Sequence, residues 1–170
     1  MSGFPEILNQ AADLVSRESE LVDTDDWQLE ENFFSVINSR WGPFSVDVFA
    51  NYYNKKCERF YSLFYSPGAI GVDAFTYDWN SENCLLVPPV SIVGRALHHL
   101  SLCKSKGALI VPLWPSSHFW PLLFRDFNKY IKDILIVKGN KVLKHGLNSN
   151  SLLGSKSFDG QVLALFIDCS

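Results

Sequence analysis

The chain has 170 residues, of which 47% are hydrophobic, 14% aromatic and 19% charged, so it has the length and apolar content of one domain with an ordinary core. This composition excludes disorder over most of the chain, and the longest apolar runs are too short to cross a bilayer. A net charge of −3 argues against binding of duplex nucleic acid through bulk electrostatics, because such binding requires a concentrated basic face.

The four cysteines are scattered along the chain, without the Cys-x-x-Cys or nearby Cys/His spacing that is typical of zinc sites. The first residues do not have the pattern of a signal peptide. We therefore expect reduced, mostly buried thiols in an intracellular protein of the cytoplasm or nucleus. We expect no bound metal and no membrane partner.

The N-terminal half of the chain predicts one helix followed by short strands. Asp25 or Asp26 can cap a helix that continues through Arg40 with an apolar residue at every fourth position, and Gly42-Pro43 ends it. This helix should cover one face of a sheet. Apolar runs between turn residues predict strands at residues 44–50, 71–75 and 83–87.

The C-terminal half predicts helices and strands in alternation. Helical spacing of apolar residues predicts helices over 91–104 and 117–130. Further apolar runs predict strands at residues 107–114, 131–138 and 161–168. Residues 139–160 are rich in Asn, Ser, Gly and Lys and predict a loop. Because uniformly apolar strands suit a parallel sheet buried on both faces, the expected fold is α/β, Rossmann-like, with a doubly wound and mostly parallel sheet.

In open sheets of this kind, ligands bind at the carboxyl ends of the strands, beside the point where the strand order reverses. Asp47, Asp73 and residues 87–90 fall at such ends. Each has a structural interpretation as well, because aspartates cap helices and form turns, and prolines are favoured where a strand ends and a helix begins. The residues alone leave both interpretations open.

An ordered series of motifs passes through these strand ends. It consists of Val46-Asp47-Val48-Phe49-Ala50, Asn54, Cys57, Val72-Asp73-Ala74-Phe75, Asp78-Trp79, Val87-Pro88-Pro89-Val90, Pro112-Leu113-Trp114-Pro115 and Phe119-Trp120. In order and spacing, the series resembles phage-type DNA N6-adenine methyltransferases. It resembles more closely the methyltransferase-like domain in the pol polyprotein of DIRS-type retrotransposons, which integrate with a tyrosine recombinase.

The segment Asn9–Arg17 also resembles the last motif of a retroelement ribonuclease H. Together the two resemblances imply a ribonuclease H remnant or linker at residues 1–24 and a methyltransferase-like domain at residues 25–170. The adjoining reverse transcriptase, ribonuclease H and recombinase domains would then be partners of this chain.

The resemblance also implies a cofactor. S-adenosylmethionine would lie across the carboxyl edge of the sheet, with the carboxylate of Asp47 and the backbone of Phe49 and Ala50 near its charged end. Asp73 would accept hydrogen bonds from its ribose or adenine. We expect no other cofactor.

In the methyltransferases, the turn that corresponds to residues 87–90 holds the target base. An Asn or Asp there accepts hydrogen bonds from the amine, and an aromatic residue after the prolines stacks on the extruded base. In the turn Val87-Pro88-Pro89-Val90 of this chain, the two valines have neither an acceptor nor a ring. The resemblance therefore implies a methyltransferase-like fold with a degenerate catalytic turn.

The cations Lys55, Lys56 and Arg59, with the ring of Trp120, are the candidate contacts to single-stranded DNA or an RNA–DNA hybrid. A basic group of this size is also typical of a solvated surface. Three functions stay open: a degenerate methyltransferase-like domain that binds nucleic acid or helps a pol polyprotein fold, an active S-adenosylmethionine-dependent DNA N6-adenine methyltransferase, and a structural spacer between the polyprotein's enzymes.

Overall fold

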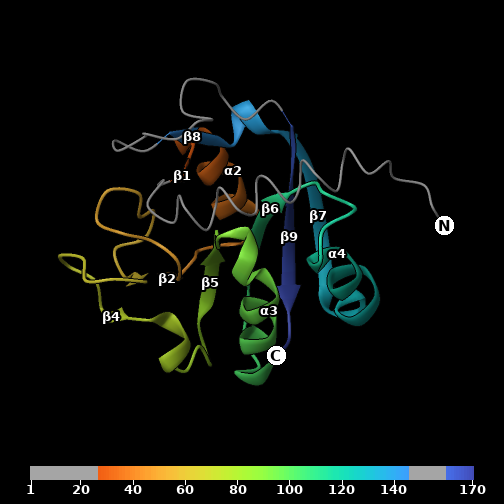
Figure 1. Cartoon of the computed structure of the whole chain (residues 1–170). Coiled ribbons are helices and arrows are strands. Elements are labelled where there is room, and N and C mark those ends of the chain that lie inside the picture. The colour runs from red at the N-terminus through yellow and green to blue at the C-terminus, as the bar shows by residue number, and fades with distance from the viewer. Residues whose placement is uncertain (1–26, 146–159) are drawn as a thin grey trace.

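The computed structural model describes residues 27–145 and 160–170. Its main element is a mixed sheet of five strands in the order β2-β5-β6-β9-β7 (Figure 1). These strands are β2 (Val46–Asp47), β5 (Asn83–Leu86), β6 (Lys106–Pro112), β9 (Gln161–Asp168) and β7 (Ile131–Lys138). The strands β2, β5 and β6 are parallel, whereas β9 is antiparallel to both of its neighbours.

Two short strands extend this series beyond β2. The strand β3 (Tyr61–Ser62) pairs in parallel with β4 (Gly71–Val72), and Phe60 forms a parallel bridge with Asp47 at the end of β2. The order in space is therefore β4, β3, β2, β5, β6, and the chain order reverses between β2 and β5. The prediction of a strand through residue 75 is wrong, because a 3₁₀ turn, η1 (Ala74–Thr76), follows β4.

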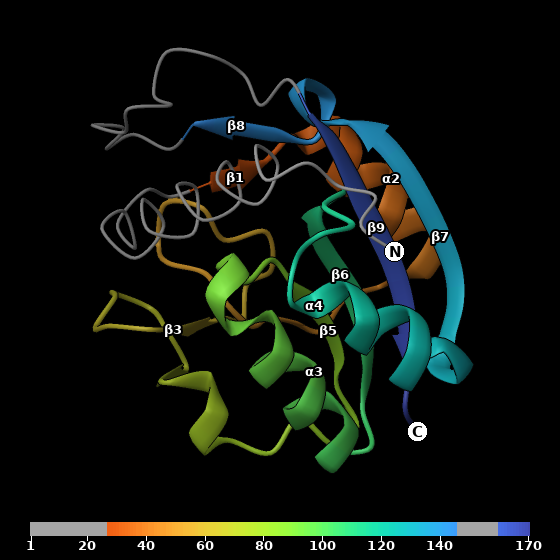
Figure 2. The same ribbon diagram turned by 45° about the vertical axis from the view of Figure 1, so that its right-hand side comes forward.

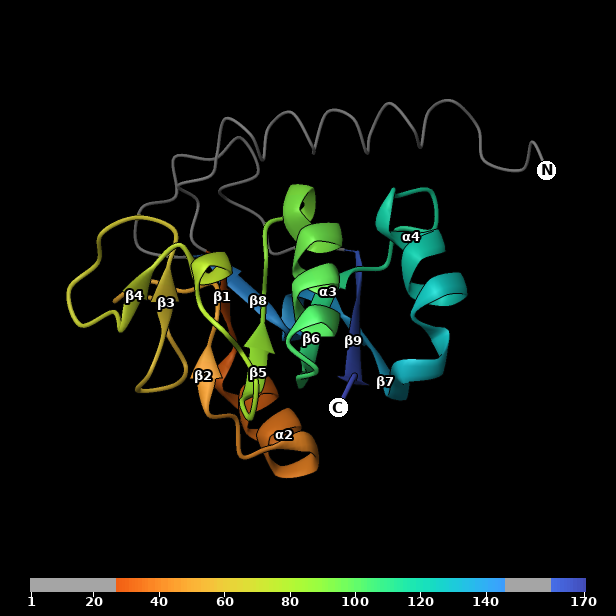
Figure 3. The same cartoon turned by 90° about the horizontal axis from the view of Figure 1, so that it is seen from below.

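The helix α2 (Glu31–Trp41) covers one face of the sheet, whereas α3 (Val93–Leu102) and α4 (Phe119–Pro121) cover the other (Figure 3). The buried side chains of α2 pack on sheet residues of the same cluster, among them Leu85, Ala108, Ile110, Val162 and Ala164. The predicted end of this helix is confirmed, because the amide of Gly42 donates to the carbonyl of Asn38 at 2.9 Å and caps it.

The predicted start of this helix at Asp25 or Asp26 is wrong. Residues before Glu31 form a strand, β1 (Trp27–Leu29), that pairs antiparallel with β8 (Leu143–His145). Leu29 stands at helical spacing with the buried residues of α2, but its side chain reaches the same core from a strand. Between β7 and β8 lies a short 3₁₀ turn, η5 (Gly139–Lys141).

The opposite face carries α3 (Val93–Leu102), which follows a 3₁₀ turn, η2 (Val90–Ile92), and confirms the predicted helix at 91–104. The buried side chains of α3 pack on β5, β6 and β9. The helix predicted over 117–130 is divided into α4 (Phe119–Pro121), a π-helical segment η3 (Leu122–Asp126) and a 3₁₀ turn η4 (Asn128–Tyr130).

The four cysteines are free thiols, as predicted, but Cys84 alone among them is fully buried. In the ranges that the structure describes, no helix combines the length and the apolar character needed to span a membrane.

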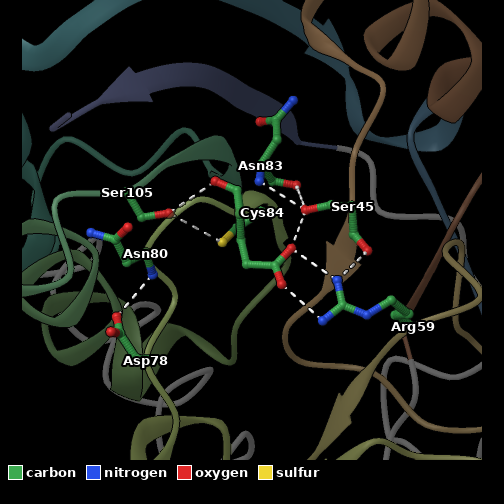
Figure 4. Close-up of polar contacts among 8 residues, drawn as sticks. Ser45, Arg59, Asp78, Asn80, Asn83, Cys84 and Ser105 are labelled. Carbon is green, nitrogen blue, oxygen red and sulfur yellow. Dashed lines mark hydrogen bonds and ion pairs between the residues drawn. The ribbon is translucent and has the colours of Figure 1, made fainter.

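A polar network fixes the amino ends of the parallel strands (Figure 4). The carboxylate of Glu82 accepts hydrogen bonds from the Ser45 hydroxyl and from the guanidinium of Arg59, with the closest Arg59 nitrogen at 2.8 Å. The Ser105 hydroxyl donates to the carbonyl of Glu82 at 3.0 Å. Burial alone would raise the pKa of Glu82, but the bonds from Arg59 and Ser45 outweigh it and lower that pKa. This network joins the segments that lead into β2, β5 and β6.

Candidate functional site

A cavity of about 240 Å³ lies at the carboxyl ends of β3, β4 and β5. Its lining comes from the loops after these strands and from the first turns of the following helix, namely Leu63, Phe64, Asp73, Phe75, Pro89, Ile92 and Arg95. The cavity thus spans the point between β2 and β5 where the chain order reverses. Ligands of open α/β sheets bind at this place.

Asp73 supplies a carboxylate to the cavity. It follows β4 with a left-handed backbone (φ 61°), and its side chain accepts a hydrogen bond from the amide of Phe75 at 3.2 Å. A left-handed conformation is unfavourable for residues other than glycine, although aspartate tolerates it better than most. Because such residues cluster at ligand sites, the backbone of Asp73 agrees with a binding role.

Phe75 forms a rigid apolar wall of the cavity. Its ring packs against Phe49, with the centroids 5.5 Å apart, and against the fully buried Trp79. The indole Nε1 of Trp79 donates to the carbonyl of Ala74 at 3.0 Å, which fixes this cluster to η1. The guanidinium carbon of Arg95 lies 4.0 Å from the centroid of the Phe75 ring, a cation–π contact.

The cavity suits a nucleoside group. It offers apolar surface for a flat base and one carboxylate for the hydroxyl groups of a sugar. Its volume of about 240 Å³ is below the roughly 300–1,000 Å³ of typical ligand pockets. The residues present therefore fit the adenosine part of S-adenosylmethionine better than the whole molecule.

Of the four residues predicted to bind the cofactor, only Asp73 lines the cavity. The side chain of Asp47 is buried (3% exposed for the residue), and its carboxylate accepts a hydrogen bond from the amide of Lys56 at 2.9 Å. Burial raises the pKa of Asp47 to about 7. Phe49 is buried behind Phe75, and the amide of Ala50 donates to the backbone of β3. The cofactor roles of these three residues stay predictions.

In the loop after β2, three backbone amides bond to side chains of the loop itself. The amide of Asn51 donates to Oδ1 of Asn54 at 2.7 Å, and the amides of Tyr53 and Asn54 donate to Oδ1 of Asn51 at 2.8 and 3.0 Å. These bonds agree with the expectation that Asn54 holds the loop by side-chain to backbone bonds. The amides of residues 51, 53 and 54 are therefore engaged within the protein.

The turn Val87-Pro88-Pro89-Val90 leads from β5 into α3. Val87 packs against the core beneath α2, whereas Val90 packs against the core beneath α3. Pro88 is buried, and Pro89 lines the cavity. Both valines therefore fill apolar surroundings on opposite faces of the sheet, while the turn itself stands at the cavity. A catalytic role of the turn stays a prediction.

The residues predicted to bind nucleic acid lie in different surroundings. Lys56 is paired with Glu31, and its side chain is 3% exposed. Arg59 belongs to the network at the amino edge. Lys55 places its Nζ 5.5 Å from the centroid of the Phe60 ring, and Trp120 packs against a neighbouring aromatic ring. The structure does not bring these four side chains to one surface, and their role stays a prediction.

Four lining residues, Leu63, Phe64, Ile92 and Arg95, were not predicted as site residues from the sequence. Phe75 entered it only as part of a motif. A signal existed for Arg95, because it is a single cation among the apolar residues that open a buried helix. Phe64 follows a strand too short to be recognised from its pattern.

A comparison with protein families finds a match that covers the candidate site. The model of the DNA N-6-adenine-methyltransferase (Dam) family matches residues 17–121, which include the turn 87–90 and every residue that lines the cavity. No curated protein matches the chain. Since the match spans more than half of the 170 residues, the chain belongs to the DNA N-6-adenine-methyltransferase (Dam) family.

Proposed function

We propose that this chain is an S-adenosylmethionine-binding domain of the DNA adenine methyltransferase type whose target-base turn no longer supports catalysis. The observation that carries the proposal is the placement of Val87 and Val90, which pack against the two cores at the turn where the family holds its target base. Membership in the family supports the cofactor and DNA as the class of ligand.

The proposed architecture is a Rossmann-like, doubly wound sheet. Helices on both faces support it, as does the reversal of chain order between β2 and β5 (Figure 1). The antiparallel strand β9 is the departure from a purely parallel arrangement.

The proposed biological setting is a retrotransposon pol polyprotein of the DIRS type, in which the domain binds nucleic acid or assists folding. The ordered series of motifs supports this setting. The proposed ribonuclease H remnant, residues 1–24, lies outside the described residues.

When bound, S-adenosylmethionine supplies an activated methyl group. The carboxylate of Asp73 would accept hydrogen bonds from its ribose hydroxyls, and the side chains of Phe75 and Ile92 would contact its adenine. Methyl transfer depends mainly on in-line positioning of the target nitrogen. A missing acceptor costs about 1–3 kcal/mol, and a missing stacking ring costs about 1–3 kcal/mol. Together these losses slow the reaction by about 30-fold to 3 × 10⁴-fold.

Asp73→Asn should weaken the binding of S-adenosylmethionine about tenfold, because an amide replaces a charged acceptor. Asparagine tolerates the left-handed backbone and can still accept from the amide of Phe75, so the turn should stay folded. Titration calorimetry of the purified chain measures the affinity. Asp47→Ala is a poor probe, because it would leave the buried Lys56 amide without its acceptor.

The matched control is Asp78→Asn, which makes the same chemical change at an exposed carboxylate outside the cavity lining. It should bind the cofactor as the wild type does. Absence of heat with folded wild-type protein at millimolar cofactor would overturn the cofactor proposal. Equal affinities of the Asp73 and Asp78 variants for S-adenosylmethionine would show that Asp73 does not contact the cofactor.

Val87→Asn combined with Val90→Tyr should create adenine methylation, because it restores one acceptor and one ring at the turn. Transfer of a labelled methyl group to DNA measures this gain, and each single variant should give less product. The double variant should also unfold more easily, by about 1–3 kcal/mol, since the asparagine replaces an apolar side chain of a packed core.

Two results would contradict the proposal of a degenerate turn. Wild-type protein that already methylates adenine at the rate of the double variant would identify an active enzyme. A folded double variant that binds the cofactor and gives no product would show that the loss of activity extends beyond the turn.

A further inference from the structure

The carboxyl edge of the sheet exposes four aromatic side chains. Tyr52, Tyr53, Phe64 and Tyr65 have 54%, 59%, 68% and 86% of their surface exposed. We call these four residues the aromatic platform. Single exposed apolar residues are normal on a protein surface, but a group of large rings marks an interaction site.

The platform comes from two loops that the structure joins. One loop follows β2 and the other follows β3 (Figure 2). The amide of Tyr52 donates to the hydroxyl of the buried Ser66 at 2.9 Å and joins the two loops. The rings of Tyr52 and Tyr53 meet edge to face, with their centroids 5.4 Å apart. The hydrogen bonds of Asn51 and Asn54 also fix the first loop. The backbone beneath the rings is therefore ordered before any ligand arrives.

The platform adjoins the proposed cofactor cavity through Phe64, which lines the cavity together with Asp73 and Arg95. Two cations lie on this side of the molecule: Arg95, over the ring of Phe75, and Lys55, near the ring of Phe60. Neither cation has an ion pair within the described part of the chain. Exposed rings beside unpaired cations match the chemistry of a strand with stacked bases and phosphates.

We propose that the aromatic platform binds single-stranded nucleic acid by stacking its rings on successive bases. The inference rests on the proposed function, which places a nucleic-acid ligand at this edge of the sheet. A single strand is favoured over a duplex for two reasons. Base faces are accessible only when the bases are unpaired, and a chain of net charge −3 lacks the broad basic surface that duplex binding requires.

The aromatic platform can supply the stacking contact that the turn 87–90 lacks. Val90 has no ring to offer a base, whereas Phe64 presents a ring at the cavity and Tyr65, the next residue, is 86% exposed. Base–aromatic stacking contributes about 1–3 kcal/mol per base and depends little on sequence. The domain would therefore hold a strand with little preference for a target base.

Fluorescence anisotropy of a labelled oligothymidylate at low salt tests this inference, with a duplex of the same length as the competing ligand. Tyr65→Leu removes a ring but keeps an apolar side chain, and it should weaken binding about 5-fold to 100-fold. Tyr65→Phe keeps the ring and should bind as the wild type does. Leu102→Ala, at a residue 66% exposed near the other end of α3, is the control.

Three results would overturn the inference: no saturable binding of the oligothymidylate by folded wild-type protein, tighter binding of the duplex, or unchanged affinity of Tyr65→Leu. Unchanged affinity would show that binding of the strand does not depend on the platform. Calorimetry with S-adenosylmethionine on the same samples separates this inference from the proposed function. Tyr65→Leu should bind the cofactor normally, and Asp73→Asn should bind the oligothymidylate normally.

Discussion

Trp79→Ala should lower the free energy of unfolding by about 3–5 kcal/mol, the largest single-residue effect expected in this domain. Trp79 is fully buried and contacts the rings of Phe49, Phe75 and His99. Its removal leaves a large cavity and takes one of two hydrogen bonds from the carbonyl of Ala74, which still accepts from the amide of Tyr77. Because Phe75 loses its support, binding of S-adenosylmethionine should weaken as well.

Chemical denaturation followed by circular dichroism measures this change. Trp120→Ala is the control, because it removes the same side chain from a partly exposed position on the same face. Its effect on the free energy of unfolding should be clearly smaller. If both variants lose the same free energy of unfolding, the cluster around Trp79 contributes no more to stability than the partly exposed Trp120 does.

The domain should lose stability as the pH rises from about 4 to above 7, through Asp47. Burial raises the pKa of this carboxyl from 3.8 to about 7 in the folded protein. Between these values the native state binds more protons than the unfolded state, so the free energy of unfolding falls as the pH rises. The difference between these two pKa values corresponds to a loss of about 4 kcal/mol in the free energy of unfolding. This is an upper value, which is reached once the buried carboxyl is ionised.

Asp47→Asn isolates this contribution. Its amide oxygen can still accept from the amide of Lys56, but the side chain carries no charge at any pH. The variant should match the wild type near pH 4 and exceed its stability above pH 7, as measured by denaturation at both values. Equal pH dependence of the two proteins would mean that Asp47 does not titrate in this range. Other carboxyls, such as Asp133 with its pKa lowered to about 2 by Arg40 and Trp41, act in the opposite direction and are common to both proteins.

The longer elements of this fold were predictable from the sequence. The strands β6 and β9 and the helix α3 are apolar runs whose burial leaves a strong pattern, whereas β5 was predicted from a shorter apolar run and β7 from a run that is only partly buried. The direction of β9 was not predictable, because a strand that is buried on both faces has the same apolar pattern in parallel and antiparallel pairs. The two-residue strand β3 was missed, since Tyr61 and Ser62 are too few to show an alternation.

The candidate site was predictable only in part. The position of Asp73 after an apolar strand indicated the cavity, because topology places such residues at the carboxyl edge. Asp47 stands in a similar sequence context but is turned into the core, where the amide of Lys56 meets its carboxylate. Nothing in the sequence near Asp47 distinguishes these two arrangements, which depend on the path of a loop and not on its composition.

The place of β9 in the sheet has a consequence for biosynthesis. This strand follows β6 and β7 in the sequence but lies between them and pairs with both. While a ribosome is still producing the chain, β6 and β7 cannot meet through hydrogen bonds, and each has an open edge of the kind that joins neighbouring chains. Assembly of this half of the sheet therefore waits until Gln161–Asp168 has been made, and nascent chains are exposed to mispairing until that moment.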